Sequence, residues 1–249
     1  VASAADFMAA AAEADGSPAR IRVLRDGQEL VFSVCPRQTE KGWVFGVWLR
    51  DSISGIGTVT FYDPETGFYG ALGHPINDAD TGEMLPLGSG EVMDAEVQEV
   101  KKGKCGLPGE LVGSFRFDAK CGSVLDNTAC GIFGYLDGAD FAGAEALELA
   151  APSVGEATIL SNVEGTEVAE YGIRIEQVWQ DETRSMCFRV TDDALLARTG
   201  GVVQGMSGSP ILQDGHLVGA VTHVLVNDPT RGYGISMEKM LEAAETVEL

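Results

Sequence analysis

From residue 42 onward the chain is a succession of short β-type runs, with Gly, Asp and Pro between them and no helical pattern separating them. Strands that recur in this way predict an all-β sandwich or a pair of barrels. The 32 glycines are more than a chain of 249 residues usually holds, and many tight turns account for the excess. The expected strands are 43–49, 56–63, 68–72, 110–117, 130–136, 158–163, 167–178, 186–191 and 216–226.

Clear helical patterns stand at the two ends of the chain. Residues 3–14 are rich in Ala, and residues 237–247 place apolar side chains at helical spacing, so each segment predicts a helix. Two alternating runs on either side of Asp26-Gly27 predict a hairpin. A helix and a hairpin are too small to fold alone, so the first 36 residues pack on the main domain or belong to a domain that began before Val1.

Charge and composition narrow the classes of function. The chain has 17 Lys and Arg against 38 Asp and Glu, a net charge of −21, which repels nucleic-acid phosphate. Because no run approaches the ~20 apolar residues of a membrane helix, we expect a soluble chain, with any targeting segment upstream of Val1. The five cysteines include no CxxC pair and indicate neither a zinc site nor a full disulfide framework. We expect no metal and no cofactor.

A candidate nucleophile lies in a glycine-rich segment near the C-terminal end. Residues 200–210 read GGVVQGMSGSP, with Ser207 between flexible positions that leave its hydroxyl uncrowded. The backbone N–H groups of Gly205 and Ser207 can point at one oxygen, which is what an oxyanion hole requires. A short Gly/Ser-rich turn that takes no part in catalysis has the same composition. Only a candidate general base elsewhere in the sequence can decide between a catalytic loop and a structural turn.

The base must be one of three histidines. His74 follows a predicted strand and begins a loop, where a β scaffold exposes functional side chains, so it is the preferred base. His216 follows a tight turn and is expected in solvent. His223 lies inside a predicted strand and is the reserve candidate.

An acid is expected to orient the histidine. Asp192 directly follows the predicted strand 186–191 and is the preferred residue, 15 positions before Ser207. Asp78 and Asp80 are closer to His74 along the chain, but they are equally typical of a turn.

Two long segments together resemble one known family, the SpoIVB peptidases, which are stage IV sporulation serine peptidases of endospore-forming bacteria. Residues 50–82 read RDSISGIGTVTFYDPETGFYGALGHPINDADTG, and residues 199–235 read TGGVVQGMSGSPILQDGHLVGAVTHVLVNDPTRGYGI. The resemblance covers about residues 37–249. It implies a trypsin-like double β-barrel and a catalytic triad in the order His74, Asp192, Ser207.

The resemblance also implies a domain organisation and a biological setting. Residues 1–36 resemble the C-terminal half of a PDZ domain, and residues 37–249 would be the peptidase domain. The implied enzyme cleaves itself and a regulator of an intramembrane protease in the pro-sigma-K activation pathway. It would act outside the cytoplasm, in the intermembrane space of the forespore, with its full-length parent tethered to a membrane upstream of Val1.

The predicted reaction is peptide hydrolysis through an acyl-enzyme on Ser207, with His74 as base and the N–H groups of Gly205 and Ser207 as oxyanion hole. The substrate pocket is expected from the residues before Ser207 and from the strand after it. An alternative function is a catalytically idle or locked PDZ and β-barrel module that recruits a membrane partner. The expected substrate-binding residues are Val202, Val203, Gln204, Gly219, Ala220, Val221, Thr222 and His223.

Overall fold

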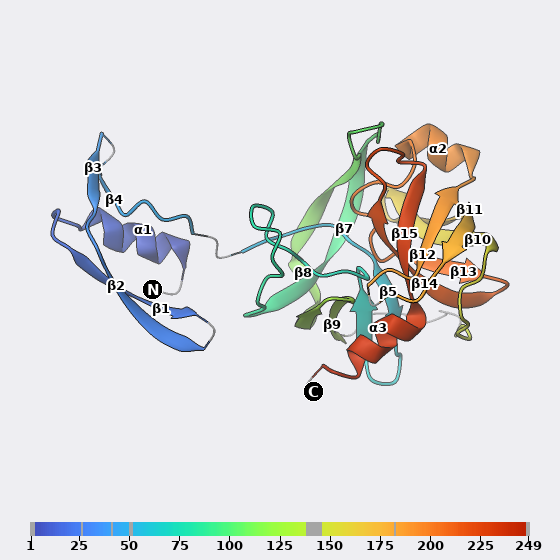
Figure 1. Cartoon of the computed structure of the whole chain (residues 1–249), viewed down its shortest axis with the longest axis horizontal. Coiled ribbons are helices and arrows are strands. Elements are labelled where there is room, and N and C mark those ends of the chain that lie inside the picture. Colours follow the sequence, from blue (N-terminus) through green and yellow to red (C-terminus); the bar gives the residue numbers. More distant parts are fainter. Residues whose placement is uncertain are drawn as a thin grey trace. The chain divides into compact units, whose positions relative to one another are not determined.

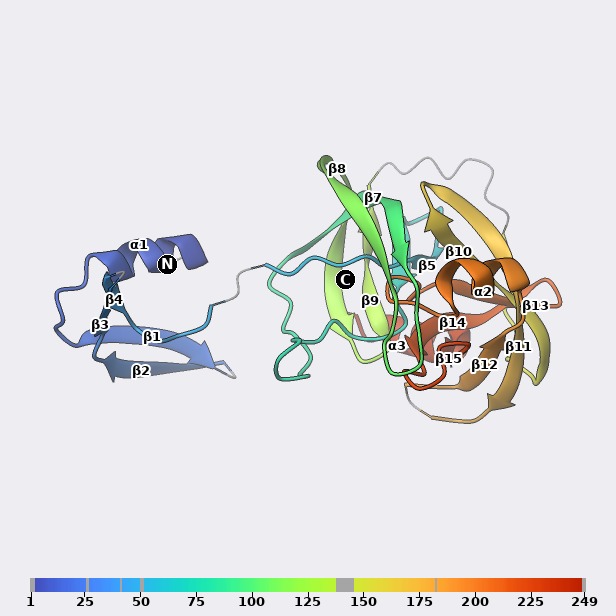
Figure 2. The ribbon, with the colours of Figure 1, turned by 90° about the horizontal axis from the view of Figure 1, so that it is seen from above.

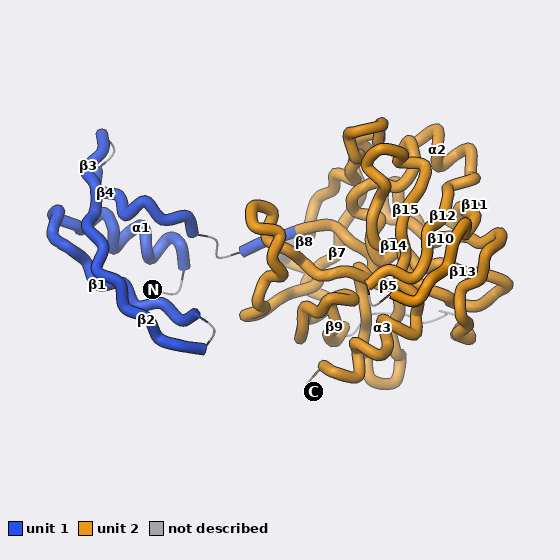
Figure 3. Tube along the Cα trace, in the orientation of Figure 1, with its two compact units in different colours: residues 1–54 blue, residues 55–249 orange. Residues whose placement is uncertain are grey.

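The structure is a computed structural model, and it describes residues 3–25, 27–40, 42–49, 52–137, 146–181 and 183–247. The chain divides into two units, Val1–Ser54 and Gly55–Leu249 (Figure 3). Every residue of the predicted site belongs to the second unit, so the site can be described within one compact body.

The first unit contains the two predicted N-terminal elements. Helix α1 (Ala4–Ala12) begins at a capping box, in which Ser3 and Asp6 each accept the other's backbone N–H through their side chains. Strands β1 (Ala19–Arg25) and β2 (Gln28–Val34) pair as an antiparallel hairpin, which confirms the prediction. Asp26 of the predicted turn lies outside the described residues.

A second hairpin extends this unit beyond the expected boundary after residue 36. It is formed by β3 (Arg37–Thr39) and β4 (Gly42–Val44). The ring of Phe45 meets that of Phe7 edge to face, with centroids 6.0 Å apart, and Trp43 packs against the backbone of Gly16. Because these contacts hold the second hairpin to α1 and the turn that follows it, the compact unit ends at Ser54.

The second unit begins with a five-stranded antiparallel sheet, a half-barrel, in the spatial order β5-β6-β9-β8-β7. Strands β7 and β8 form a long ribbon that is visible in Figure 2. Strand β9 lies between β8 and β6, so the chain returns to the start of the sheet after the ribbon. The strands are β5 (Val59–Tyr62), β6 (Phe68–Ala71), β7 (Gly90–Lys101), β8 (Glu110–Thr128) and β9 (Gly131–Leu136).

The rest of the second unit is a closed six-stranded barrel in the order β10-β11-β12-β15-β14-β13 (Figure 1). Pairing of β10 with β13, where Ile159 is opposite Ile211, closes the barrel. The strands are β10 (Gly155–Glu164), β11 (Glu167–Val178), β12 (Met186–Val190), β13 (Pro210–Gln213), β14 (His216–Val224) and β15 (Arg231–Ser236).

Two helices belong to the barrel. Helix α2 (Asp193–Thr199) follows β12, and helix α3 (Met237–Ala244) follows β15 and is the predicted C-terminal helix. Met237 and Met240 of α3 are buried together with Ile235 of β15. No helix within the described ranges is long and apolar enough to cross a membrane.

Alternation of side chains along the strands fills the barrel. Met186, Phe188 and Val190 of β12 point inward and are at most 2% exposed, and they join the main hydrophobic core with Ile173 and Ile175 of β11. Period-two alternation is the pattern of a strand with one face in a core. The prediction of a mainly β protein is therefore confirmed, with one closed barrel and one half-barrel.

Several elements were missed by the sequence analysis. Strands β3, β7, β13 and β15 and helix α2 were not expected, and of the expected strand 43–49 only its start is paired, in β4. Strand β15 was missed because Gly232 and Gly234 are untypical of a strand. A Cβ at Gly232 would lie 2.7 Å from Phe188 Cζ, so neighbouring side chains occupy the space that these glycines leave.

Candidate active site

Ser207 lies on the loop between α2 and β13, and two glycines determine the path of this loop. Gly205 has φ +100 and Gly208 has φ +88, a region that other residues rarely adopt. Gly208 also passes very close to the half-barrel, since a Cβ there would lie 2.0 Å from the carbonyl oxygen of Thr58. The sequence therefore needs glycine at both positions.

This loop is hydrogen-bonded to the edge of the half-barrel. Thr58 N–H donates to Ser207 O over 2.8 Å, and the Thr60 hydroxyl donates to Gly208 O over 2.8 Å. Gly208 N–H donates to Val221 O of β14 over 2.8 Å. The loop is thus fixed between the barrel that carries it and the sheet that carries His74.

His74 follows β6 after a tight turn. Leu72 has φ +67, which is uncommon for a residue with a side chain, and such strained positions cluster at functional sites. Leu72 N–H donates to Thr58 O over 3.2 Å. Because Thr58 also binds Ser207 O, one residue of the half-barrel links the histidine turn to the serine loop.

The imidazole of His74 is held by the next residue. Its Nδ1 lies 2.8 Å from Pro75 O. A carbonyl oxygen only accepts hydrogen bonds, so Nδ1 carries the proton and Nε2 of the neutral ring is left as an acceptor. This is the tautomer that a general base needs.

Asn127 fixes the segment after His74, and the sequence analysis did not identify it. Its side-chain oxygen accepts from Ile76 N–H over 2.8 Å, and its NH₂ group donates to Ile76 O and Leu85 O over 2.9 Å each. The residue is 6% exposed. An Asn near a strand end is typical of a turn, so the sequence held no signal for this contact between positions 51 residues apart.

His223 meets His74 in space. Their ring centroids are 4.8 Å apart, at an interplanar angle of 41°. The register of β14 against β15 shifts between Val221 and His223, so Thr222 forms a β-bulge, a feature that often redirects side chains next to active sites.

Ser207 reaches the same bulge. Its hydroxyl donates to Thr222 O over 3.0 Å. The structure therefore brings Ser207, His74 and His223 together around Thr222. Within the described residues, Ser207 and His74 form no direct hydrogen bond with each other.

Partial loss of hydration lowers the pKa of both rings. Desolvation lowers the pKa of His74 below its usual 6.5, and the bond to the Pro75 carbonyl opposes this in part. Desolvation lowers the pKa of His223 to about 4, with further contributions from His74 and from the Arg184 guanidinium. Both rings are therefore neutral at pH 7.

Asp192 has a different environment from the one expected for a triad acid. It does follow β12 directly, but there it is the N-cap of α2, where its carboxylate accepts from Leu195 N–H over 2.8 Å. Cys187 of β12 is opposite Tyr233, which is opposite His223. Within the described residues, the Asp192 carboxylate and the His74 ring form no hydrogen bond with each other, so the expected contact between acid and base is not made in this structure.

The other candidates for base and acid have structural roles. His216 is partly exposed beside Glu148, with Nε2 3.6 Å from its carboxylate. The Asp78 carboxylate accepts from the N–H groups of Asp80 and Thr81 and closes the turn after His74.

The predicted oxyanion donors are available. Within the described residues, the N–H groups of Gly205 and Ser207 donate to no acceptor. Gln204 N–H donates to Gly109 O and its carbonyl accepts from Leu111 N–H, which anchors the segment before Gly205.

The predicted substrate-binding residues are mostly buried. Two of the eight, Gln204 and His223, are exposed. The other six face the core or lie in tightly packed backbone, so their side chains contact the protein itself: Val202, Val203, Gly219, Ala220, Val221 and Thr222. Of the expected substrate-binding positions, these six therefore offer no exposed side chain to a substrate.

Comparisons with known proteins give one clear result. The family model described as SpoIVB peptidase S55 matches residues 41–241. No curated protein matches the chain. The Rv3671c protease from M. tuberculosis in its active form has a TM-score of 0.39 and 15% identity, covering 81% of this chain and 94% of its own. A mutant of Rv3671c from M. tuberculosis H37Rv in its inactive form has the same TM-score and identity, covering 53% and 68%. At this level of similarity the two structures add no argument about the site.

Proposed function

The chain belongs to the SpoIVB peptidase S55 family and is a serine peptidase. On this premise we propose that it is an endopeptidase, which hydrolyses peptide bonds within its substrate through an acyl-enzyme on Ser207. One observation supports the proposal most strongly. Ser207, which comes from the barrel, and His74, which comes from the half-barrel, meet at the Thr222 bulge, with the N–H groups of Gly205 and Ser207 left without acceptors among the described residues.

In the first step, the Ser207 hydroxyl rotates from Thr222 O toward Nε2 of His74. Its oxygen attacks the scissile carbonyl carbon, and its proton passes to Nε2. The negative charge that develops on the carbonyl oxygen is stabilised by the N–H groups of Gly205 and Ser207. The imidazolium then protonates the leaving amine, and water hydrolyses the acyl-enzyme in the reverse sequence of proton transfers.

The substrate is proposed to lie along the end of β14. Strand β13 pairs with β14 only up to Ala220, so residues 222–224 have β15 on one side and no described strand on the other. An extended peptide can pair with such an edge through main-chain hydrogen bonds. The buried residues Gly219–Thr222 then contribute by holding this edge in place rather than by side-chain contact.

Asp192 is proposed to act through α2. Its N-cap bond fixes the first turn of the helix that leads to the Ser207 loop. Asn is as good an N-cap as Asp, so Asp192→Asn is expected to keep the rate within a few fold of wild type, while Asp192→Ala lowers the unfolding free energy by about 1 kcal/mol and the rate with it. A triad acid at this position would instead lose ~10⁴ in rate on change to Asn.

The biological setting is also part of the proposal. Resemblance to sporulation peptidases supports self-cleavage and cleavage of a regulator of an intramembrane protease, outside the cytoplasm in the intermembrane space of the forespore. The assignment of residues 1–36 to half of a PDZ domain stays a prediction. Comparing a longer parent with its Ser207→Ala variant tests self-cleavage, because an identical new N-terminus in both would exclude it.

Labelling with a fluorophosphonate probe tests the activity itself. We expect wild type to be labelled at Ser207 and the Ser207→Ala variant to be unlabelled. His74→Ala should label very slowly because the hydroxyl has lost its base. Absence of labelling in a folded wild type would contradict the proposal and favour the idle module that recruits a membrane partner.

A further inference from the structure

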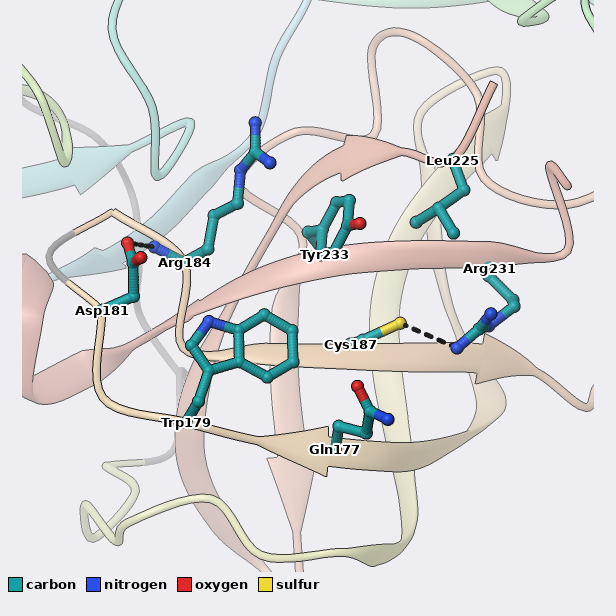
Figure 4. Close-up of a pocket in the computed structure, with 8 residues that line it drawn as sticks. All are labelled: Gln177, Trp179, Asp181, Arg184, Cys187, Leu225, Arg231 and Tyr233. Carbon is teal, nitrogen blue, oxygen red and sulfur yellow. Dashed lines mark hydrogen bonds between the residues drawn. The ribbon is translucent and has the colours of Figure 1, made fainter. Parts of the chain in front are cut away.

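A surface cavity lies beside the candidate site. It has a volume of about 600 Å³ and is open to solvent. Met186 and Phe188 of β12 point into the barrel, so Cys187 between them faces the outer side, where this cavity lies. Figure 4 shows the lining residues Gln177, Trp179, Asp181, Arg184, Cys187, Leu225, Arg231 and Tyr233.

The cavity is continuous with the proposed substrate edge. Tyr233 is opposite His223 in the pairing of β15 with β14, and Leu225 follows β14 directly. The His223 ring is in turn 4.8 Å from that of His74. A peptide along residues 222–224 would therefore place one of its side chains at this cavity.

Arg184, one cation of the cavity, forms no salt bridge in the described part of the chain, although the Asp181 carboxylate is close enough to attract it. Arg184 is exposed, and its Cζ lies 4.9 Å from the centroid of the Tyr233 ring, a cation–π contact that holds the guanidinium over the aromatic face. Asp181 is close, but its carboxylate accepts from the N–H groups of Thr183 and Arg184 and not from the guanidinium.

The charge of the second arginine of the cavity, Arg231, is balanced by a carboxylate. Arg231 Nη2 lies 2.7 Å from the Glu176 carboxylate, which also binds Arg189. Trp179 stands edge to face on Tyr233, with ring centroids 6.2 Å apart, and supplies an apolar wall. The cavity thus combines two aromatic rings with one guanidinium whose N–H donors are open to a ligand.

We propose that this cavity is a specificity site that binds an acidic side chain of the peptide substrate, with Arg184 donating to the carboxylate and the rings of Trp179 and Tyr233 contacting its methylene groups. A guanidinium presents paired N–H donors that match a carboxylate, and stacking on a ring orients it beforehand. In a chain of net charge −21, this local cation favours an acidic side chain at one position of the substrate although the whole protein repels acidic peptides. The inference rests on the proposed peptidase function.

Cleavage of a peptide library from a digested proteome, read by mass spectrometry, tests this specificity. Wild type should favour Asp or Glu at one fixed position relative to the cut by about tenfold over Gln, the size of one charge-assisted hydrogen bond. The Arg184→Ala variant should lose the preference, and Arg184→Glu should favour Lys or Arg at that position instead.

The matched control is Arg174→Glu. Arg174 lies on β11, is exposed, pairs with Glu156 and does not line the cavity. This variant changes the net charge as Arg184→Glu does, so it should keep the wild-type preference. No acidic preference in wild type, or the same profile in wild type and Arg184→Glu, would overturn the proposal.

A binding measurement separates this proposal from the peptidase function. Blocked octapeptides of Ala and Ser with one central Glu, Gln or Lys are titrated into the Ser207→Ala protein, with Trp179 fluorescence as the signal. The Glu peptide should bind about tenfold more tightly than the Gln peptide, and this difference should vanish on adding Arg184→Ala. Equal affinities for the Glu and Gln peptides would overturn the specificity site even if the fluorophosphonate probe labels Ser207. Tighter binding of the Glu peptide without labelling of Ser207 would support the specificity site and contradict the proposed peptidase function.

Discussion

The closed barrel and the half-barrel bury their apolar side chains in different ways. The barrel has a continuous core of its own, including the fully buried Ile159, Ile173 and Phe188. The half-barrel fully buries Tyr69 and Phe133, which belong to neither of these cores, and it also contributes residues to cores centred elsewhere: Val97 of β7 joins the barrel core, and Cys130, just before β9, packs with α3 and the end of the barrel. The half-barrel is therefore stabilised in part through its contact with the barrel.

This difference explains how the site is built. The barrel fixes Ser207 and the Thr222 bulge in a closed hydrogen-bonded ladder. His74 stands on the other part, and its position depends on the contact between Thr58 and the Ser207 loop. The candidate site thus exists only while the barrel and the half-barrel stay in contact. Substitutions in the barrel or in the half-barrel can test this.

The largest effect is expected from the two reacting residues. Ser207→Ala changes the barrel and His74→Ala the half-barrel, and each should lower kcat by about a million-fold, as for groups that act as a unit in other serine peptidases. The double variant should lose no more than either single variant. Losses that multiply in the double variant, measured by peptide hydrolysis on folded proteins, would mean that the two residues act separately.

A second effect concerns the pH dependence of the base. His74 must be neutral to accept a proton, and burial lowers its pKa below 6.5. Hence kcat/KM should stay at its plateau as the pH falls through 6.5, and then decrease about tenfold per pH unit below the lowered pKa of His74. His216→Asn removes a partly exposed histidine that pairs with Glu148, and it should leave this profile unchanged. A decrease that begins above pH 6.5 would contradict the burial of His74.

The unfolding free energy should also depend on pH in this range because of His223. Its pKa is about 4 in the folded protein and about 6.5 when unfolded, so the unfolded state binds more protons between these values. The unfolding free energy should therefore decrease as the pH falls from 6.5 to about 4. His223→Asn should flatten this dependence in denaturant titrations, and an unchanged slope would show that the pKa of His223 is not lowered in the folded protein.

The contact between the two parts can be weakened at Gly208. A Cβ there would lie 2.0 Å from Thr58 O and also impose φ +88 on alanine, so Gly208→Ala should lower the unfolding free energy by about 3 kcal/mol. Gly215→Ala imposes φ +79 where no atom lies within 4 Å, and should cost about 1 kcal/mol. Equal losses in chemical denaturation would mean that the close approach to Thr58 adds nothing.

The parts of this arrangement that depend on short sequence segments could be predicted from the sequence. The segments around His74 and Ser207 hold the turn glycines, the strand before and the strand after, and their convergence follows from a β scaffold with functional loops. The bulge at Thr222 depends on strand register, and the hydrogen bonds of Asn127 depend on partners far along the chain. No short sequence pattern encodes either feature. Asp192 shows the limit most clearly, since its place at a strand end was predicted, but not its role as the N-cap of α2.

The smallest effect isolates one hydrogen bond across the contact between the two parts. Thr60→Val keeps the shape of a residue that is 6% exposed and removes its bond to Gly208 O, so the unfolding free energy should fall by about 1 kcal/mol. Thr128→Val removes the bond from Thr Oγ1 to Gly131 O and the bond that Thr Oγ1 accepts from Cys130 N–H, and both of these lie within the half-barrel. Thr128→Val should therefore lose at least as much stability as Thr60→Val, but only Thr60→Val should lower kcat, because only its bond holds the Ser207 loop against the half-barrel. An equal loss of kcat in both variants would show that general stability, and not this contact, controls the position of Ser207 relative to His74.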